Sequence, residues 1–206
     1  MTPAAFRAAL AAVPAFDRDV WLDRVLGLDD IAPDDASLPR GCVPHLPSPI
    51  DKLLEVAVHA NVRPGDVVID IGSGAGRASV AMHLLSGATV IGLEIQPSLV
   101  RAARELSARM SVEAMVAVVE GDAAITVAQI STGSVFFLYC PFGGERLAKV
   151  LSHVEAIART RPVRVCCLDM PELDGPWLEL TSRPSAGLDI YCSATPVTSR
   201  TFRPVT

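Results

Sequence analysis

Short apolar runs alternate with segments of helical periodicity through the middle of the chain. Val67–Ile71 is a β-branched run of the kind found in strands that are buried on both faces. Similar runs predict further strands, and apolar residues at helical spacing predict the helices between them. The strands are expected at 67–71, 89–93, 114–119, 135–139 and 163–168, and the helices at 77–85, 98–110 and 145–159. This alternation predicts an α/β fold with a doubly wound, mostly parallel sheet.

Two helices and an irregular segment are predicted ahead of this region. Thr2 and Pro3 suit the cap and first turn of one helix, and residues 17–28 form the second. Residues 29–49 contain five prolines, which break both periodic patterns. We therefore divide the chain into an N-terminal part with two helices and a Pro-rich loop, residues 1–49, and a main domain, residues 50–206.

Local signals predict one further helix start and a terminal hairpin. Ser48 is placed to cap the next helix, Pro49 suits its first turn, and Asp51 completes a capping box. Near the end of the chain, residues 177–180 and 188–192 have the composition of strands, and a turn joins them. A terminal antiparallel hairpin fits this arrangement.

Composition and charge exclude some classes of protein. The chain has 206 residues, of which half are hydrophobic and a fifth charged, so it is a globular protein of about one domain. The formal net charge of -5 disfavours nucleic acid as a partner. Residues 123–144 carry no charge, but polar residues at their centre and Pro141 favour strand–turn–strand over a membrane span. Within the α/β fold, the same run is interpreted as a helical region, the buried fourth strand and the element 139–144. No signal peptide is recognisable at the N-terminus.

The cysteines bear on the compartment. There are five, an odd number, and none forms a CxxC pair. Reduced thiols in the cytoplasm are therefore expected, with neither a disulfide framework nor a zinc site. The four histidines make no metal pattern either. The oligomeric state stays open.

The main chemical signal is the glycine-rich turn after residues 67–71. Asp70 lies in this run, and Gly72, Gly74 and Gly76 follow it. Glycines allow a tight turn and close approach to a ligand, and the helix that follows offers N–H groups to an anion. The dinucleotide fingerprint needs a glycine at the sixth position, where this chain has Arg77, so an NAD-dependent oxidoreductase is the less favoured alternative.

Two further acids follow the next two predicted strands. Glu94 lies 24 residues beyond Asp70, and an acid that binds a ribose is expected about 20 residues on. Asp122 follows the third strand. Because the carboxyl ends of neighbouring parallel strands meet at one edge of a sheet, the three acids predict a single ligand site.

An acid two positions ahead of glycines at the first, third and fifth positions resembles the class I S-adenosylmethionine-dependent methyltransferases. The resemblance implies a Rossmann-like sheet of seven strands, the last of them antiparallel, with S-adenosylmethionine as cofactor. In such a site Asp70 holds the ammonium group and the loop amides face the carboxylate. Glu94 accepts from the ribose, Ile95 packs on the adenine, and Asp122 with Ala123 N–H meets the adenine edge. The implied cofactor residues are Asp70, Gly72, Ser73, Gly74, Gly76, Glu94, Ile95, Asp122 and Ala123.

The end of the fourth strand, Tyr139-Cys140-Pro141-Phe142, faces the methyl group in this class. Amino-group methyltransferases carry Asp/Asn-Pro-Pro-aromatic here, and only Pro141 and Phe142 match. With residues 45–77, the element more nearly resembles the Dot1-like branch, which comprises histone-lysine methyltransferases and shorter bacterial relatives. Cys140 stands where that branch has asparagine. The predicted substrate pocket consists of Tyr139, Pro141 and Phe142.

The candidate catalytic residues are Tyr139, Cys140 and His45. Cys140 is interpreted as lining the pocket rather than as a nucleophile, because no electropositive setting is evident. His45 lies in the Pro-rich loop, which would act as a lid, and is a candidate base or substrate contact.

The predicted function is methyl transfer from S-adenosylmethionine to an unassigned acceptor, either a small molecule or a protein amine. Alignment and exclusion of water supply most of the catalysis, because the sulfonium is already activated. The alternatives are a module that binds the cofactor as a partner or sensor, and the NAD-dependent oxidoreductase.

Overall fold

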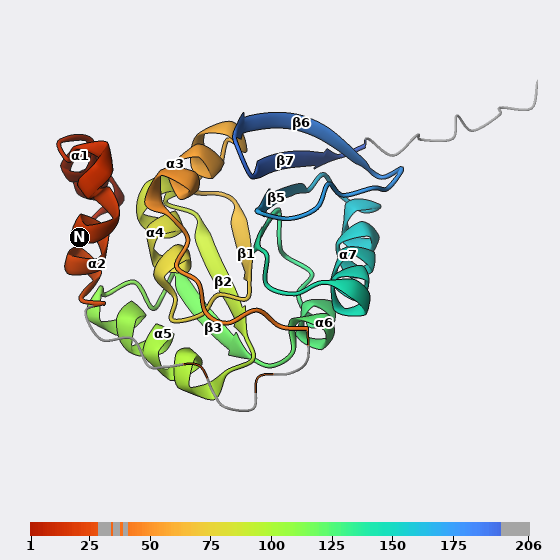
Figure 1. Ribbon diagram of the computed structural model, residues 1–206, viewed down its shortest axis with the longest axis horizontal. Helices are drawn as coiled ribbons and strands as arrows, with labels where there is room; N and C mark the ends of the chain where they lie inside the picture. Colours follow the sequence, from red (N-terminus) through yellow and green to blue (C-terminus); the bar gives the residue numbers. More distant parts are fainter. Residues whose placement is uncertain (29–33, 35–37, 39–40, 195–206) are drawn as a thin grey trace, which may run out of the picture.

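The protein is described by a computed structural model covering residues 1–28, 34, 38 and 41–194. Its strands are β1 (Val67–Ile71), β2 (Thr89–Glu94), β3 (Val116–Glu120), β4 (Val135–Tyr139), β5 (Arg164–Leu168), β6 (Leu178–Ser185) and β7 (Leu188–Ser193). They form one seven-stranded sheet in the order β3-β2-β1-β4-β5-β7-β6 (Figure 1). Strands β1 to β5 pair in parallel, and β7 is antiparallel to both of its neighbours. The predicted doubly wound fold and its terminal hairpin are confirmed.

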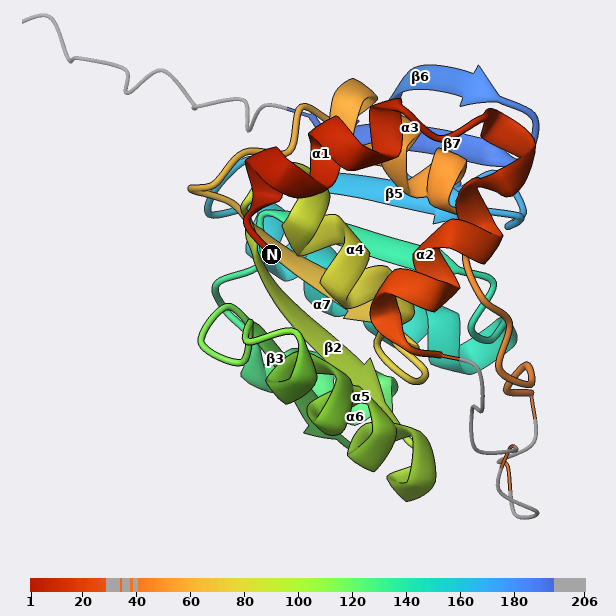
Figure 2. The ribbon, with the colours of Figure 1, turned by 90° about the vertical axis from the view of Figure 1, so that its left-hand side faces the viewer.

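Helices cover both faces of the sheet. One face carries α3 (Ile50–His59), α4 (Arg77–Ser86) and α5 (Pro97–Arg109), and the other carries α6 (Ala123–Thr126) and α7 (Gly144–Ala158) (Figure 1). Two N-terminal helices, α1 (Pro3–Ala11) and α2 (Arg18–Leu26), lie outside α3 and α4 (Figure 2). No helix of the described ranges is long and apolar enough to cross a bilayer.

Alternation along the strands divides the apolar side chains between two cores. In β1, Val68 packs into the core beneath α3 and α4, whereas Ile69 and Ile71 pack into the core beneath α7. Successive side chains of a strand point to opposite faces, so Asp70 lies on the same face as Val68. This register sends the Asp70 carboxylate toward α4, where Ser79 donates a hydrogen bond to it.

The N-terminal helices share the core of the main sheet. Phe6 and Leu10 of α1 and Leu22 and Leu26 of α2 are buried in one cluster with side chains of α3 and α4. The predicted Thr2 cap is confirmed, since its hydroxyl accepts from Ala5 N–H at 3.3 Å. The division of the chain at residue 49 remains a prediction.

The predicted capping box at the start of α3 is wrong. Pro49 occupies the cap position, and the Ser48 side chain makes no cap hydrogen bond. Instead Asp19 of α2 accepts from Ile50 N–H at 2.9 Å, and Asp51 pairs with Arg18 at 2.6 Å. Side chains of α2 thus cap the start of α3, a role that the local sequence pattern assigned to residues 48–51.

The charge-free stretch 123–144 contains a helical region followed by a strand, as its interpretation within the α/β fold predicts. It begins with α6 and a 3₁₀ turn, Val127–Gln129, and its second half contains β4. Asp122 caps α6 by accepting from Ala124 N–H at 3.0 Å. This cap favours a helix at the start of the stretch.

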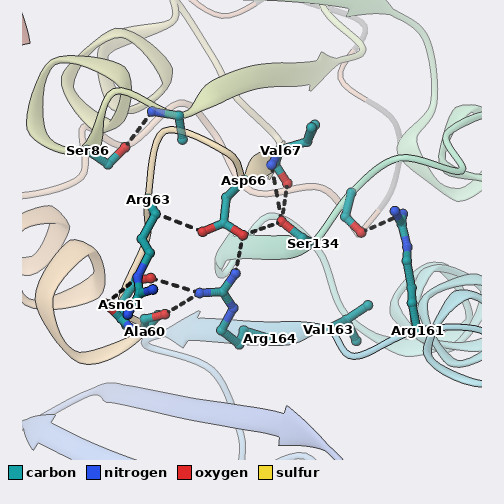
Figure 3. Close-up of polar contacts among 12 residues, drawn as sticks. Ala60, Asn61, Arg63, Asp66, Val67, Ser86, Ser134, Arg161, Val163 and Arg164 are labelled. Carbon is teal, nitrogen blue, oxygen red and sulfur yellow. Dashed lines mark hydrogen bonds and ion pairs between the residues drawn. The ribbon is translucent and has the colours of Figure 1, made fainter.

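A polar network joins the starts of three central strands (Figure 3). The Asp66 carboxylate, just before β1, accepts from Arg63 N–H and Ser134 Oγ at 2.8 Å each, and pairs with Arg164 at the start of β5. Arg164 also donates to the Ala60 carbonyl at 2.6 Å. Burial alone would raise the pKa of the Asp66 carboxyl, but these hydrogen bonds hold that pKa below its usual value. The network fixes the edge of the sheet opposite the glycine-rich turn.

Replacing Asp66 with Asn is expected to lower the free energy of unfolding by about 2 kcal/mol at pH 7, because charge-assisted hydrogen bonds are lost. The wild-type advantage should disappear as the pH falls below about 4, since the depressed pKa contributes stability only while the folded carboxylate is ionised. Urea unfolding at several pH values measures both effects.

The matched control for this network is a second, exposed ion pair. Arg159 and Glu155 lie one turn apart on α7, and the Arg159 side chain is 75% exposed. Glu155→Gln should change stability by less than about 0.5 kcal/mol. An Asp66→Asn effect no larger than the control would contradict the role assigned to the network.

Candidate functional site

An open cleft of about 820 Å³ lies at the carboxyl ends of β1, β2 and β4. Asp70, Glu94 and Asp122 all line it, so the structure brings together the three acids that the sequence placed at successive strand ends. The cleft lies where the strand order reverses between β1 and β4, the usual ligand position in a doubly wound sheet.

The glycine-rich turn is tightly enclosed. Gly72, Gly74 and Gly76 all have positive φ values, of 80°, 55° and 84°. A Cβ on Gly72 would lie 2.8 Å from Pro141 Cβ, and one on Gly74 would lie 2.3 Å from His45 Nδ1. Both the backbone conformation and the space therefore require glycine at Gly72 and Gly74.

Most of the amides in this turn are engaged within the protein. The Gly72 and Ser73 N–H groups donate to the Leu93 carbonyl at 2.9 and 3.0 Å, and Gly74 N–H donates to the Glu94 carboxylate at 2.9 Å. Gly76 N–H donates to the Ser73 carbonyl at 3.0 Å. These four amides differ from the expectation that the loop presents free N–H groups to a ligand carboxylate.

Asp70 is a buried carboxylate, with only 4% of its surface exposed. Ser79 Oγ of α4 donates to it at 2.6 Å. Burial, only partly offset by the Ser79 hydrogen bond, and the nearby Glu94 charge raise the pKa of Asp70 to about 6. A cationic group in the cleft would stabilise the ionised form of this side chain.

Glu94 ends β2 and is also buried, at 6% exposed. Its two carboxylate oxygens accept from Gly74 N–H at 2.9 Å and from Gln96 N–H at 2.8 Å. These bonds orient the carboxylate and tie β2 to the glycine-rich turn. Ile95, the next residue, lines the same cleft.

Asp122 lies at the far end of the cleft beside Ala123. Besides capping α6, its carboxylate pairs with Arg146 of α7. This ion pair compensates the Asp122 charge, whereas no ion pair among the described residues involves Asp70 or Glu94. The excess negative charge of the cleft therefore lies at the ends of β1 and β2.

The segment 41–49 lies across the cleft as a lid, and the rest of the Pro-rich stretch is described only at Asp34 and Leu38. Cys42 forms an isolated bridge with Phe142, and Val43 N–H donates to the Pro141 carbonyl at 3.1 Å. Asp34 accepts from His45 N–H at 2.9 Å and from Gln96 Nε2 at 2.8 Å. The lid thus contacts both the turn after β4 and the end of β2.

The predicted substrate residues Tyr139, Cys140, Pro141 and Phe142 line the cleft at the end of β4. Cys140 has φ 31°, a left-handed conformation that is strained for a residue with a Cβ. Burial, and then the charge of Asp169, raises the pKa of the Cys140 thiol and of the Tyr139 hydroxyl. Cys140 therefore stays a thiol at neutral pH, which argues against its use as a nucleophile.

Cys166, Cys167 and His83 do not line the cleft. Cys166 and Cys167 are buried in β5, and burial raises the pKa of both thiols, that of Cys167 to about 12. His83 Nδ1 lies 2.8 Å from the Ala88 carbonyl oxygen, a structural contact. Across the described ranges, no group of three or more His, Cys, Asp or Glu side chains could hold a metal ion.

Three polar residues of the site were missed by sequence reasoning. Arg77 was interpreted only as a departure from the dinucleotide pattern, yet its buried guanidinium pairs with Asp19 and Asp23 of α2. Asp34 and Asp169 carry no local motif. Their positions depend on contacts between segments that are distant in sequence, so no spacing rule could have found them.

Comparisons with known proteins agree with this geometry. Residues 63–132 match the family described as a methyltransferase domain. A ribosomal protein L11 methyltransferase of Symbiobacterium thermophilum is 41% identical over 75 residues, which are 34% of this chain and 25% of that protein. The aligned part thus spans about a quarter of that curated relative.

Solved structures extend the likeness beyond the glycine-rich turn. An RNA methyltransferase from Salinibacter ruber, crystallised with S-adenosyl-L-homocysteine, is 28% identical, with a TM-score of 0.50, over 73% of this chain and 92% of that one. Residues 63–132 and the fold of this chain are thus similar to those of the class I S-adenosylmethionine-dependent methyltransferases. A methyltransferase from Podospora anserina, with a TM-score of 0.57 and 14% identity over 73% of this chain and 80% of that one, shares the fold.

The burial of Asp70 leads to a specific prediction about stability. Its raised pKa means that the folded protein binds a proton more tightly than the unfolded chain between about pH 4 and 6. The Asp70 contribution to stability is therefore present below about pH 4 and is lost as the pH rises through 6. The stability of the unliganded wild type, relative to Asp70→Asn, should fall by roughly 2 to 3 kcal/mol over that range.

Urea unfolding of the two unliganded proteins between pH 4 and 7 measures this difference. Glu113→Gln, which changes an exposed carboxylate outside the cleft, is the control and should show no such trend. If the difference in unfolding free energy between wild type and Asp70→Asn stayed constant over this pH range, the pKa of Asp70 would not be raised by burial.

Proposed function

We propose that the protein transfers a methyl group from S-adenosylmethionine to an acceptor that reaches the end of β4. The observation that carries the proposal is the placement of three acids, at the ends of β1, β2 and β3, in one cleft with the glycine-rich turn. The likeness to a methyltransferase that was solved with S-adenosyl-L-homocysteine supports it.

The excess charge of the cleft decides how the cofactor is oriented. Asp70 is buried and uncompensated by any described cation, so it holds the ammonium group of the amino-acid part. Glu94 accepts from the ribose hydroxyls through lone pairs that its two N–H partners leave free. Ile95 packs against the adenine, and Asp122 with Ala123 N–H meets the adenine edge. This order along β1, β2 and β3 leaves the methyl group facing Tyr139 and Cys140.

S-adenosylmethionine supplies a methyl group that is already activated on a sulfonium. The protein's own residues position the reactants and exclude water. The lid segment 41–49 covers the cleft, and Tyr139 and Phe142 line the space beside the methyl group. Tyr139 remains a neutral phenol at neutral pH, because burial and then the Asp169 charge raise its pKa. It therefore orients the acceptor by hydrogen bonding and does not act as an anionic base.

For the acceptor we favour an amine, on a small molecule or on a protein. Asp169 follows β5, and its charge raises the pKa values of both Tyr139 and Cys140 at the end of β4. Cys140 N–H donates to the Leu168 carbonyl at 3.2 Å, which brings the two strand ends together. A carboxylate at this position attracts an ammonium and disfavours an anionic acceptor. The ammonium must first release its proton, to this carboxylate or to solvent, so that the nitrogen lone pair can attack the methyl group. The resemblance to the Dot1-like branch points to the same chemistry, although Cys140 replaces its asparagine.

Cofactor binding is tested by isothermal titration calorimetry with S-adenosylmethionine and, in parallel, with NAD. Wild type should bind S-adenosylmethionine, and Asp70→Asn and Glu94→Gln should each weaken binding tenfold or more. Wild-type affinity should also fall as the pH drops below about 6, because a proton then competes with the ligand ammonium for Asp70. Binding of NAD without any response to S-adenosylmethionine would refute the proposal.

The acceptor class is tested by transfer of a labelled methyl group into fractionated cell lysate. Label in amine-containing small molecules or in protein lysine is the expected result. Asp169→Asn should raise KM for that acceptor by about tenfold while leaving the Kd for S-adenosylmethionine within twofold. Label only in nucleic acid, or none in any fraction, would contradict the amine proposal, and the latter outcome would favour a binding module without turnover.

A further inference from the structure

Two polar atoms of the cleft-lining residues are buried without a hydrogen-bond partner. Among the described side chains, His45 Nε2 and Ser73 Oγ are the atoms in this condition. A buried polar atom without a partner costs free energy, and such an atom beside a ligand cleft indicates a partner that arrives with the ligand. Both residues lie next to Gly74, His45 from the lid and Ser73 from the turn.

The two atoms differ in where they lie. A Cβ on Gly92 of β2 would be 2.5 Å from Ser73 Oγ and 3.2 Å from Ser79 Oγ. The Ser73 hydroxyl is therefore beneath the turn, on the side of the Ser79 hydroxyl that donates to Asp70. The His45 ring, which belongs to the lid, packs against Gly74 where a Cβ would lie, so a ligand that binds beside Gly74 meets this ring.

The surroundings of His45 keep its ring neutral and hold it in place. Burial is the main cause that lowers its pKa, and Arg77 adds to this, whereas the charges of Asp34 and Glu94 act in the opposite direction. The His45 backbone N–H donates to both oxygens of Asp34, at 2.9 and 3.1 Å. A neutral imidazole has one N–H and one acceptor nitrogen, so Nε2 can serve as a donor.

Four amides of the glycine-rich turn are not available as donors to a ligand at this end of the cleft. If Asp70 holds the ammonium group, the carboxylate on the same carbon atom must lie close by, over the glycine-rich turn. The amides of Gly72, Ser73, Gly74 and Gly76 already donate within the protein. A carboxylate placed beside Asp70 and Glu94 without a donor would be unfavourable.

We propose that His45 binds the carboxylate of the cofactor's amino-acid part through its Nε2–H, and is neither a general base nor an acceptor contact. The inference rests on the proposed function. It also links the lid to the cofactor, because His45 belongs to the segment 41–49 and its backbone is bound by Asp34. Ligand binding then gives His45 Nε2 the hydrogen-bond partner that it lacks among the described residues.

The test compares two ligands that differ in the amino-acid part. S-adenosylhomocysteine carries that part, whereas 5′-methylthioadenosine has the same nucleoside and sulfur without it. By calorimetry, His45→Ala should raise the Kd for S-adenosylhomocysteine tenfold or more and leave that for 5′-methylthioadenosine within twofold. His45→Asn, which keeps an N–H donor, should recover part of the affinity. His59→Ala, on the exposed side of α3, is the matched control and should change neither Kd.

The alternatives give different results. Equal loss of both ligands in His45→Ala would show that His45 only supports the lid and would overturn the inference. Unchanged affinity for both ligands, with a loss of turnover, would assign His45 to the acceptor side and would also overturn it. Failure of the wild type to bind either ligand would instead refute the proposed function itself. Thermal unfolding of each variant confirms that the protein is folded.

Discussion

The buried guanidinium of Arg77 is the interaction on which the site depends. Only 3% of this side chain is exposed, and it lies at the first position of α4, immediately after the glycine-rich turn. It pairs with Asp23 at 2.6 Å and Asp19 at 2.8 Å, and it also donates to the Ser48 carbonyl at the end of the lid. A buried charge is tolerated only when its partners are in place, so α2, the lid and the turn must be ordered together.

The same requirement explains why some features were predictable from sequence and others were not. The strands and helices of the central sheet follow from apolar periodicity, and the ligand edge follows from parallel topology, so Asp70, Glu94 and Asp122 could be brought together in advance. The start of α3 could not, because Asp19 of a separate helix supplies the cap. The roles of Asp34 and Asp169 could not be predicted from the sequence either, since the residues they interact with lie far away along the chain.

Close packing makes the lid part of the site. Gly74 has no space for a Cβ because the His45 ring occupies it, and Gly72 is closed by Pro141. The glycines that sequence reasoning assigned to a ligand are thus also required by the protein's own lid and by the turn after β4. A glycine pattern alone reports a close approach, and only the structure tells whether a ligand, a side chain or both make it.

The three acids of the cleft differ in whether a cation compensates their charge. Asp122 is compensated by Arg146, whereas Asp70 and Glu94 have no described ion-pair partner, and burial, followed by the Glu94 charge, raises the pKa of Asp70. Burying such a pair destabilises the empty protein, and a cationic ligand relieves the repulsion, so part of the stability of the fold is supplied only on binding. The net charge of the chain says little about the acceptor for the same reason, because the uncompensated carboxylates that contribute to it lie in the cleft at the ends of β1 and β2.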